Sequence, residues 1–342
     1  MDAKITKLRL SRMLSYDWIK IVAIAVAAII VWTLIFTMTA TRITPAQEFT
    51  VMNYIGNVSN GSTGFHTLYQ KSFKDGVYSH EVIELKNYDL AASAEYAGTL
   101  MQAYVSTDDG DVIFAADIPD PTFIYKDKDG KEQKGTYLDS LLLGYRYNLY
   151  NLDLEAENGF FKKMEKYLAG YYVGGDFKSE TAVLDTAKIK SDFLARIERT
   201  GDKRYKTDEK LQAGIKGENE RIIKYRNALL EFYGYLEEGI ISLTAKELSV
   251  IGSTGGVSEI KGTYAINLCP DELTMKNLYK TAAYVGTTKD ENGADQKVLM
   301  AKDMHICIFD MPGTEEGFQY EPLLFINYVI RNSRTVAENS GN

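Results

Sequence analysis

The first feature along the chain is an unbroken apolar run over residues 21–38, IVAIAVAAIIVWTLIFTM, whose only polar side chains are Thr33 and Thr37. It contains no charged residue, no Pro and no Gly. As a helix, a run of this length extends about 27 Å, close to the hydrocarbon thickness of a bilayer. A helix also satisfies its own backbone hydrogen bonds, which lipid cannot do. A buried core helix is the alternative, but so uniform a run favours a transmembrane helix through residues 21–38.

The residues on either side of this run indicate its orientation. Residues 1–20 hold more cations than anions and are expected to stay in the cytoplasm; the charged residues are Lys4, Lys7, Arg9, Arg12 and Lys20 against Asp2 and Asp17. A cleaved signal peptide has an apolar core of about 7–15 residues and small residues at the cleavage site. Here the core is longer, and cleavage after Ala40 would place the bulky Met38 where a small residue is needed. We therefore expect a retained anchor, a spacer over 39–48 and an extracellular remainder.

Residues 49–122 alternate between strand-like and helix-like patterns. The spacing predicts strands at 49–55, 80–85 and 111–115, and helices at 65–74 and 90–105. The third strand, DVIFA, is almost continuously apolar, as a parallel strand buried on both faces would be. This β-α-β-α-β order, with right-handed crossovers, predicts a doubly wound α/β half-domain.

Residues 123–256 depart from this alternation. A polar stretch, KDKDGKEQKG, predicts a protruding hairpin, and apolar residues at helical spacing then predict helices at 138–149, 158–168, 186–198 and 208–236. In the last of these, we interpret the charged residues Glu218, Glu220, Arg221 and Lys224 as a solvated face. Residues 251–256, IGSTGG, indicate a loop or hinge.

The section from 257 to 333 is expected to return to the first lobe as α/β structure. Its patterns predict strands at 263–268 and 302–310 and helices at 271–284 and 315–330, followed by a polar tail at 334–342. The two cysteines, Cys269 and Cys307, each lie in or beside a strand-like run. They form either a disulfide or two buried thiols, and the thiols are favoured because sequence spacing does not set Cβ geometry.

The net charge of the chain limits the classes of partner that it is expected to bind. Beyond residue 40 the chain carries 34 Lys and Arg against 45 Asp and Glu, a net charge of −11. Such an acidic exterior domain argues against nucleic acid and against broad docking to anionic lipid. The whole chain is 45% hydrophobic, which is enough to build a core.

The stretch TLMQAYVSTDDGDVIFAAD, the opening β-α-β-α-β run and the closing EPLLFINYVI resemble the extracellular solute-binding proteins of bacterial ABC importers, which have the type II periplasmic-binding fold. The resemblance covers 49–120 and 263–333. It implies a doubly wound domain that captures a small polar solute, such as a saccharide, and docks to an ABC permease or another surface protein. The chain departs from that family because it has a membrane helix and no Cys before residue 269.

A ligand cleft in such a fold lies where parallel strands end at the switch point. Polar residues after the three predicted strands are therefore candidate ligand contacts: Asn57, Ser59, Asn60, Asn87, Tyr88 and Asp117. Ordinary turn and capping roles are the alternative for the residues at 57–60 and for Asp117.

Motifs for catalysis and for metals are not evident in the sequence. The histidines at 66, 80 and 305 are scattered, and the DKDG and DENG stretches at 127–130 and 290–293 lack a full calcium-ligand set. We therefore expect a protein without catalytic residues, metal or cofactor. The leading hypothesis is a membrane-anchored extracytoplasmic solute-binding protein. The alternative is a surface scaffold or assembly subunit that retains the fold without a ligand pocket.

Overall fold

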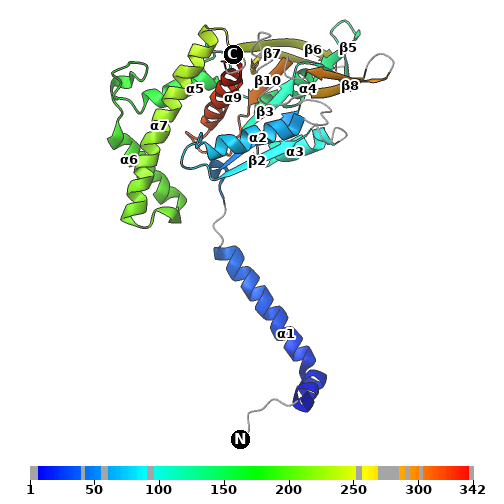
Figure 1. The fold of residues 1–342 in the computed structure, drawn as a ribbon, viewed down its shortest axis with the longest axis vertical. Coiled ribbons are helices and arrows are strands. Elements are labelled where there is room, and N and C mark those ends of the chain that lie inside the picture. The colour runs from blue at the N-terminus through cyan, green and yellow to red at the C-terminus, as the bar shows by residue number, and fades with distance from the viewer. Residues whose placement is uncertain are drawn as a thin grey trace. The chain divides into compact units, whose positions relative to one another are not determined.

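The computed structural model describes residues 7–39, 43–54, 61–90, 96–251, 256–268, 285–289, 293–299 and 303–338. The chain divides into two compact units, Met1–Thr44 and Pro45–Asn342. Each unit is described by itself. Figure 1 labels the elements of both.

The first unit contains a single long helix, α1 (Lys7–Thr39). Its stretch Trp18–Ile35 has a mean hydropathy of 2.5 and no buried residue, and within the described ranges it is the one segment long and apolar enough to cross a membrane. The Thr33 hydroxyl donates to the Ile29 carbonyl oxygen (2.8 Å), so this polar group is satisfied inside the helix. Signal sequences share this length and composition, so the retained anchor and its orientation stay predictions.

The second unit is built on a mixed sheet in the order β2-β1-β3-β10-β7-β6-β4-β5. Its first three strands, β1 (Glu48–Tyr54), β2 (Glu84–Asp89) and β3 (Val112–Ala116), are parallel. Val51 in β1 is level with Asn87 on one side and with Val112 on the other. The predicted β-α-β-α-β order of elements is therefore confirmed, with three parallel strands and β1 at their centre.

Helices cover both faces of these strands, and the apolar run in β3 shows why. Phe114 packs on one face with Tyr69 of α2 (Gly61–Lys74) and Phe325 of α9 (Glu321–Glu338), at ring-centroid distances of 6.2 Å to each. Ile113 points to the opposite face and packs with α3 (Ala97–Ser106) and α4 (Tyr137–Tyr145). Every residue of β3 is buried, as its continuous hydrophobicity predicts.

The rest of the sheet is antiparallel, so the doubly wound arrangement is limited to the first three strands. β10 (Met304–Ile308) runs antiparallel to β3 and to β7 (Val257–Asn267), and β7 pairs with β6 (Ser242–Ile251). The predicted hairpin is formed by β4 (Pro119–Lys126) and β5 (Glu132–Thr136). A separate pair, β8 (Val285–Lys289) and β9 (Asp295–Leu299), makes a two-stranded sheet.

Several boundaries differ from the sequence expectation. β2 begins at Glu84 instead of residue 80, and α9 begins at Glu321 instead of residue 315. Strand β6 was not predicted, because both of its faces are largely half-exposed and its pattern is weak. The helix expected at 271–284 lies outside the described residues. Cys307 is a free, buried thiol, and Cys269 also lies outside the described residues.

The predicted helical section is confirmed. It consists of α5 (Phe160–Ala169), α6 (Thr186–Thr200) and α7 (Asp208–Glu237). Short 3-10 turns lie at Pro45–Gln47, Arg146–Asn148, Val173–Gly175 and Lys203–Tyr205. α7 packs along α9 (Figure 1), where Asn327 Nδ2 donates to the Ala228 carbonyl oxygen at 2.8 Å.

Candidate functional site

The cleft expected at the carboxyl ends of the parallel strands is small in the described part of the chain. A cavity of about 240 Å³ lies beside Tyr54, the last residue of β1, and its lining is mostly apolar side chains of α3 and α4. The Tyr54 and Ser140 hydroxyls lie 3.2 Å apart in a hydrogen bond. Three of the predicted ligand contacts, Asn57, Ser59 and Asn60, lie outside the described residues.

Asp117 follows β3, as predicted, but it is held by other side chains. Its Oδ1 accepts hydrogen bonds from Lys246 Nζ and from Thr136 Oγ1, each at 2.7 Å. Burial alone would raise the pKa of Asp117, but these bonds outweigh burial and hold the pKa below its ordinary value. Asp117 is therefore an ionised partner of Lys246, and it ties β3 to β6.

Asn87 and Tyr88 lie inside β2 and not after the second strand, because the strand starts later than predicted. Asn87 Oδ1 accepts a hydrogen bond from Asn53 Nδ2 at 3.4 Å. The Tyr88 ring stacks on Tyr104, and its hydroxyl donates to Asp109 Oδ2 at 3.0 Å, in the loop that precedes β3. The structure does not bring Asn87 and Tyr88 together with Asp117.

A larger hollow than the one beside Tyr54 lies in the helical section. We call it the helical groove: a cavity of about 1280 Å³ between α5, α6, α7 and the loop before α9. It is lined by polar and aromatic side chains: Tyr150, Lys163, Lys166, Tyr167, Tyr171, Lys188, Asp192, Arg196, Arg199, Glu218, Arg221, Glu315, Glu316, Gln319 and Tyr320. The sequence predicted these helices without predicting a groove between them.

Aromatic rings form one part of the helical groove. Tyr167 packs against Tyr171 (ring centroids 5.0 Å apart) and against Tyr320 (5.1 Å). Tyr167 and Tyr171 are half-buried, and the Tyr171 hydroxyl donates to Asp192 Oδ2 at 3.0 Å. Each ring therefore combines an apolar face with a polar edge, an arrangement suited to amphipathic ligands.

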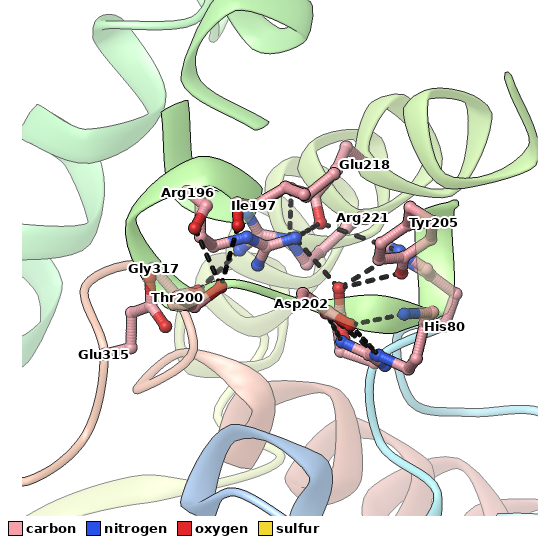
Figure 2. A network of polar contacts seen from close by, with 12 residues as sticks. His80, Arg196, Ile197, Thr200, Asp202, Tyr205, Glu218, Arg221, Glu315 and Gly317 are labelled. Atoms are coloured by element: carbon pink, nitrogen blue, oxygen red, sulfur yellow. Dashed lines mark hydrogen bonds and ion pairs between the residues drawn. The ribbon is translucent and has the colours of Figure 1, made fainter. Parts of the chain in front are cut away.

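Beneath the groove lies a buried ion network (Figure 2). Arg196 Nη2 of α6 donates to Glu81 Oε1 (2.8 Å) and to Glu218 Oε1 (2.6 Å). Glu218 Oε2 also accepts from Arg221 Nη2 at 2.6 Å, and Glu81 Oε2 accepts from Arg204 Nη2 at 2.6 Å. We call this set the arginine–carboxylate network: Glu81, Arg196, Asp202, Arg204, Glu218 and Arg221.

This network joins the helical section to the α/β section. Glu81 lies in the connection between α2 and β2, whereas its partners come from α6 and the turn before α7. Arg221 Nη1 donates to the Gly317 carbonyl oxygen (2.8 Å) in the loop before α9. The charges balance, because three arginines face three carboxylates, Asp202 included.

Buried carboxylates normally resist ionisation, but here the arginines reverse that tendency. Burial alone would raise the pKa of Glu218, whereas Arg221 and Arg196 outweigh burial and lower it. Next to them, burial lowers the pKa of His80 below its ordinary value, although Glu81 and Glu218 oppose this shift. At neutral pH, His80 is therefore uncharged beside the ionised Glu218.

His80, Glu81 and Glu218 also have the chemistry of a metal triad. One ligand atom from each lies within 4.8 Å of the others. However, Arg196 already donates to both carboxylates, and the three arginines already neutralise them. A divalent cation would add uncompensated positive charge and would have to displace Arg196. The residues therefore do not fit a metal centre.

Glycines in α7 allow the close approach that this network needs. A Cβ on Gly217 would lie 2.6 Å from His80 Cγ, and a Cβ on Gly214 would lie 2.5 Å from Phe193 Cζ. The interpretation of Glu218 and Arg221 as solvated was wrong, because they are only 3% and 4% exposed. The signal that could have found them is the pair of glycines just before them, since glycine inside a helix is otherwise unfavourable.

Comparison with protein-family models, with curated proteins and with solved structures finds no match for this chain.

Proposed function

We propose that the protein is a membrane-anchored extracytoplasmic binding protein that holds a small polar solute without covalent chemistry. The observation that carries the proposal is the helical groove, a cavity of about 1280 Å³ with half-buried tyrosines and charged side chains around it. Ligand pockets typically measure about 300–1,000 Å³, so the groove has room for a ligand of several units, such as a short oligosaccharide.

The site differs from the one that the sequence suggested. The resemblance to solute-binding proteins placed ligand contacts at the ends of the parallel strands, where Asp117 is instead paired with Lys246. The helical groove offers more polar groups and more room than the cavity beside Tyr54. Saccharide hydroxyls would bond to groups such as Asp192 and Gln319, and ring faces would stack on tyrosine.

The anchor is the second part of the proposal. With α1 retained and residues 1–20 in the cytoplasm, the binding domain would stand at the outer face of the membrane. Tethering raises the effective concentration of the domain beside a membrane partner, such as an ABC permease or another surface protein. Digestion of intact cells by external protease tests this topology: a C-terminal epitope should be lost and an N-terminal epitope kept. A mature N-terminus beyond residue 40 would contradict the anchor.

A scaffold role is the second candidate. The interaction of Asp117 with Lys246 and Thr136 favours it, because the side chain predicted to bind a ligand is already used inside the fold. A scaffold would use the helical section as a protein interface. In that case, small solutes would leave the melting temperature unchanged.

A thermal-shift screen separates the two candidates. The full chain in detergent micelles is heated with neutral sugars, oligosaccharides, amino acids or short peptides. A binder gains about 2.7 kcal/mol of stability at a ligand concentration of 100 times Kd, so its melting temperature rises. The Tyr171→Ala variant should lose that rise, whereas Tyr147→Ala should keep it, because Tyr147 is 83% exposed and lies outside the groove. An absence of any shift across the panel would favour the scaffold.

A further inference from the structure

We propose that the helical groove selects an anionic saccharide, that is, an oligosaccharide whose sugar units carry carboxylate groups. This inference rests on the function proposed above and names the ligand class of the same groove. It follows from the sign of the groove's charge, from the state of its ion pairs and from its aromatic lining.

The side chains that line the groove have the opposite net charge to the domain around it, and two of them, Arg196 and Lys163, pair with Glu81 and Asp310 outside the lining. Its lining holds six Lys and Arg against four Asp and Glu, a net charge of +2. The chain beyond residue 40 carries −11. An acidic surface repels anions in general, so a basic hollow within it concentrates an anion at one place.

Three of the groove's four acids, all except Glu316, are held in ion pairs, whereas part of its positive charge is not. Asp192 is held by Lys188 at 2.7 Å, Glu218 by the arginine–carboxylate network, and Glu315 by Arg199. By contrast, exposed Lys166 at the end of α5 has no ion pair within the described residues.

Arg196 supplies a second unused donor group. It contacts both Glu81 and Glu218 through Nη2. In the part of the chain that the structure describes, Nε and Nη1 make no hydrogen bond, and the side chain is 15% exposed at the groove. A carboxylate accepts such paired donors well, because guanidinium and carboxylate groups have matching geometry.

The aromatic lining favours a saccharide over an acidic peptide. Tyr167 and Tyr171 present adjacent rings, 5.0 Å apart between centroids, which suit the flat apolar faces of sugar units. An extended peptide would gain most from an exposed strand edge, but the groove is walled by helices and a loop, with no sheet edge in its described lining.

Calorimetric titration of the full chain in detergent micelles tests the inference with three probes. These are tetragalacturonate, the neutral tetrasaccharide of galactose, and tetraglutamate with an amidated C-terminus, a peptide with the same number of carboxylates. Tetragalacturonate should bind about tenfold more tightly than either of the others, a difference of about 1.4 kcal/mol. Its affinity should fall as salt is raised from 50 to 200 mM, because salt screens the charges.

Two lysine variants test whether the preference for the charged sugar arises in the helical groove. Lys166→Gln should weaken tetragalacturonate binding about threefold, the size expected for one exposed charge contact, and should leave the neutral sugar unaffected. Lys190→Gln removes the same charge from an exposed position on α6 outside the groove and should change neither affinity. Equal melting temperatures of the two variants show that both fold.

Each other outcome overturns the inference in a distinguishable way. Equal affinity for the charged and neutral sugars would contradict anion selection while leaving the proposed function intact. Tighter binding of tetraglutamate would replace the saccharide with a peptide. If no probe binds, the anionic saccharide is wrong, and the proposed function falls as well only if the wider thermal-shift screen is also empty.

Discussion

Arg196 and Glu218 lie on neighbouring helices and meet at 2.6 Å, while the same Arg196 nitrogen also contacts Glu81 at 2.8 Å. One guanidinium nitrogen therefore joins α6, α7 and the connection between α2 and β2. Glu81 and Glu218 are almost completely buried, so they depend on this charge. The charge of Arg196 is therefore shared between the helical section and the α/β section.

Removing that charge should destabilise the protein strongly. Arg196→Met keeps most of the side-chain volume but removes one ion-pair partner from each of two buried carboxylates, Glu81 and Glu218. This loss should lower the unfolding free energy by about 3 kcal/mol. Urea denaturation followed by circular dichroism measures the loss. Arg199→Met is the control, because this arginine is 67% exposed and should cost less than about 1 kcal/mol. Equal losses in the two variants would refute the structural importance of the network.

The glycines of α7 should respond oppositely to the same substitution. Gly217→Ala places a methyl group against the His80 ring, with 2.6 Å to Cγ, and should cost about 1–3 kcal/mol. Gly234→Ala meets nothing within 4 Å and should stabilise the helix by about 0.5–1 kcal/mol. Thermal unfolding of both variants provides the comparison. A stabilising Gly217→Ala would mean that His80 does not lie against α7.

Acidification should weaken the fold through His80. Its pKa is lower in the folded state than the ordinary 6.5, mainly because the side chain, 25% exposed, is partly removed from water. At pH values between the folded-state pKa of His80 and 6.5, the unfolded chain binds more protons than the folded chain. The unfolding free energy therefore falls as pH drops below about 6.5. His80→Gln should flatten this slope between pH 7 and pH 5, measured by urea titration. His305, whose pKa is also lowered by burial, contributes equally to both proteins and cancels. Parallel slopes would exclude His80 as a contributor.

Cys307 should be chemically inert in the folded protein. It is fully buried in β10, and burial raises the pKa of its thiol, so the reactive thiolate is scarce. In a Cys269→Ser background, iodoacetamide at pH 8 should modify Cys307 only after urea is added, as followed by mass spectrometry. Rapid modification without urea would show that β10 is not buried inside the sheet.

Local patterns were sufficient for much of the fold. The DVIFA run predicted a strand buried on both faces, and β3 is that strand. The turn at Gly130, whose φ of 77° suits glycine, sits in the predicted hairpin. Both the strand and the turn are determined by a few consecutive residues, so hydrophobic periodicity and turn residues are sufficient to predict them. The antiparallel half of the sheet was harder, because β6 is half-exposed along most of its length and lacks a clear alternation.

The candidate site depended on contacts that no local pattern contains. Glu81 and Arg196 are 115 residues apart in the sequence, yet they form a buried pair. Charged residues on a helix are usually exposed to solvent, so the sequence predicts that Glu218 and Arg221 are solvated. They are buried by tertiary packing, which the sequence pattern does not contain. The tyrosines of the groove were likewise indistinguishable from core residues until α5, α6 and α7 were placed together.

The position of β10 has a consequence for biosynthesis. This strand is the last of the described strands, yet it lies between β3 and β7, where it connects the parallel and antiparallel halves of the sheet. Ribosomal synthesis delivers residues 304–308 after every other described strand, so the two halves wait, with their inner edges unpaired, until this segment has been made. Termination of translation shortly before residue 304 would therefore leave two incomplete sheets prone to aggregation, and synthesis of β10 is a condition for closing the core.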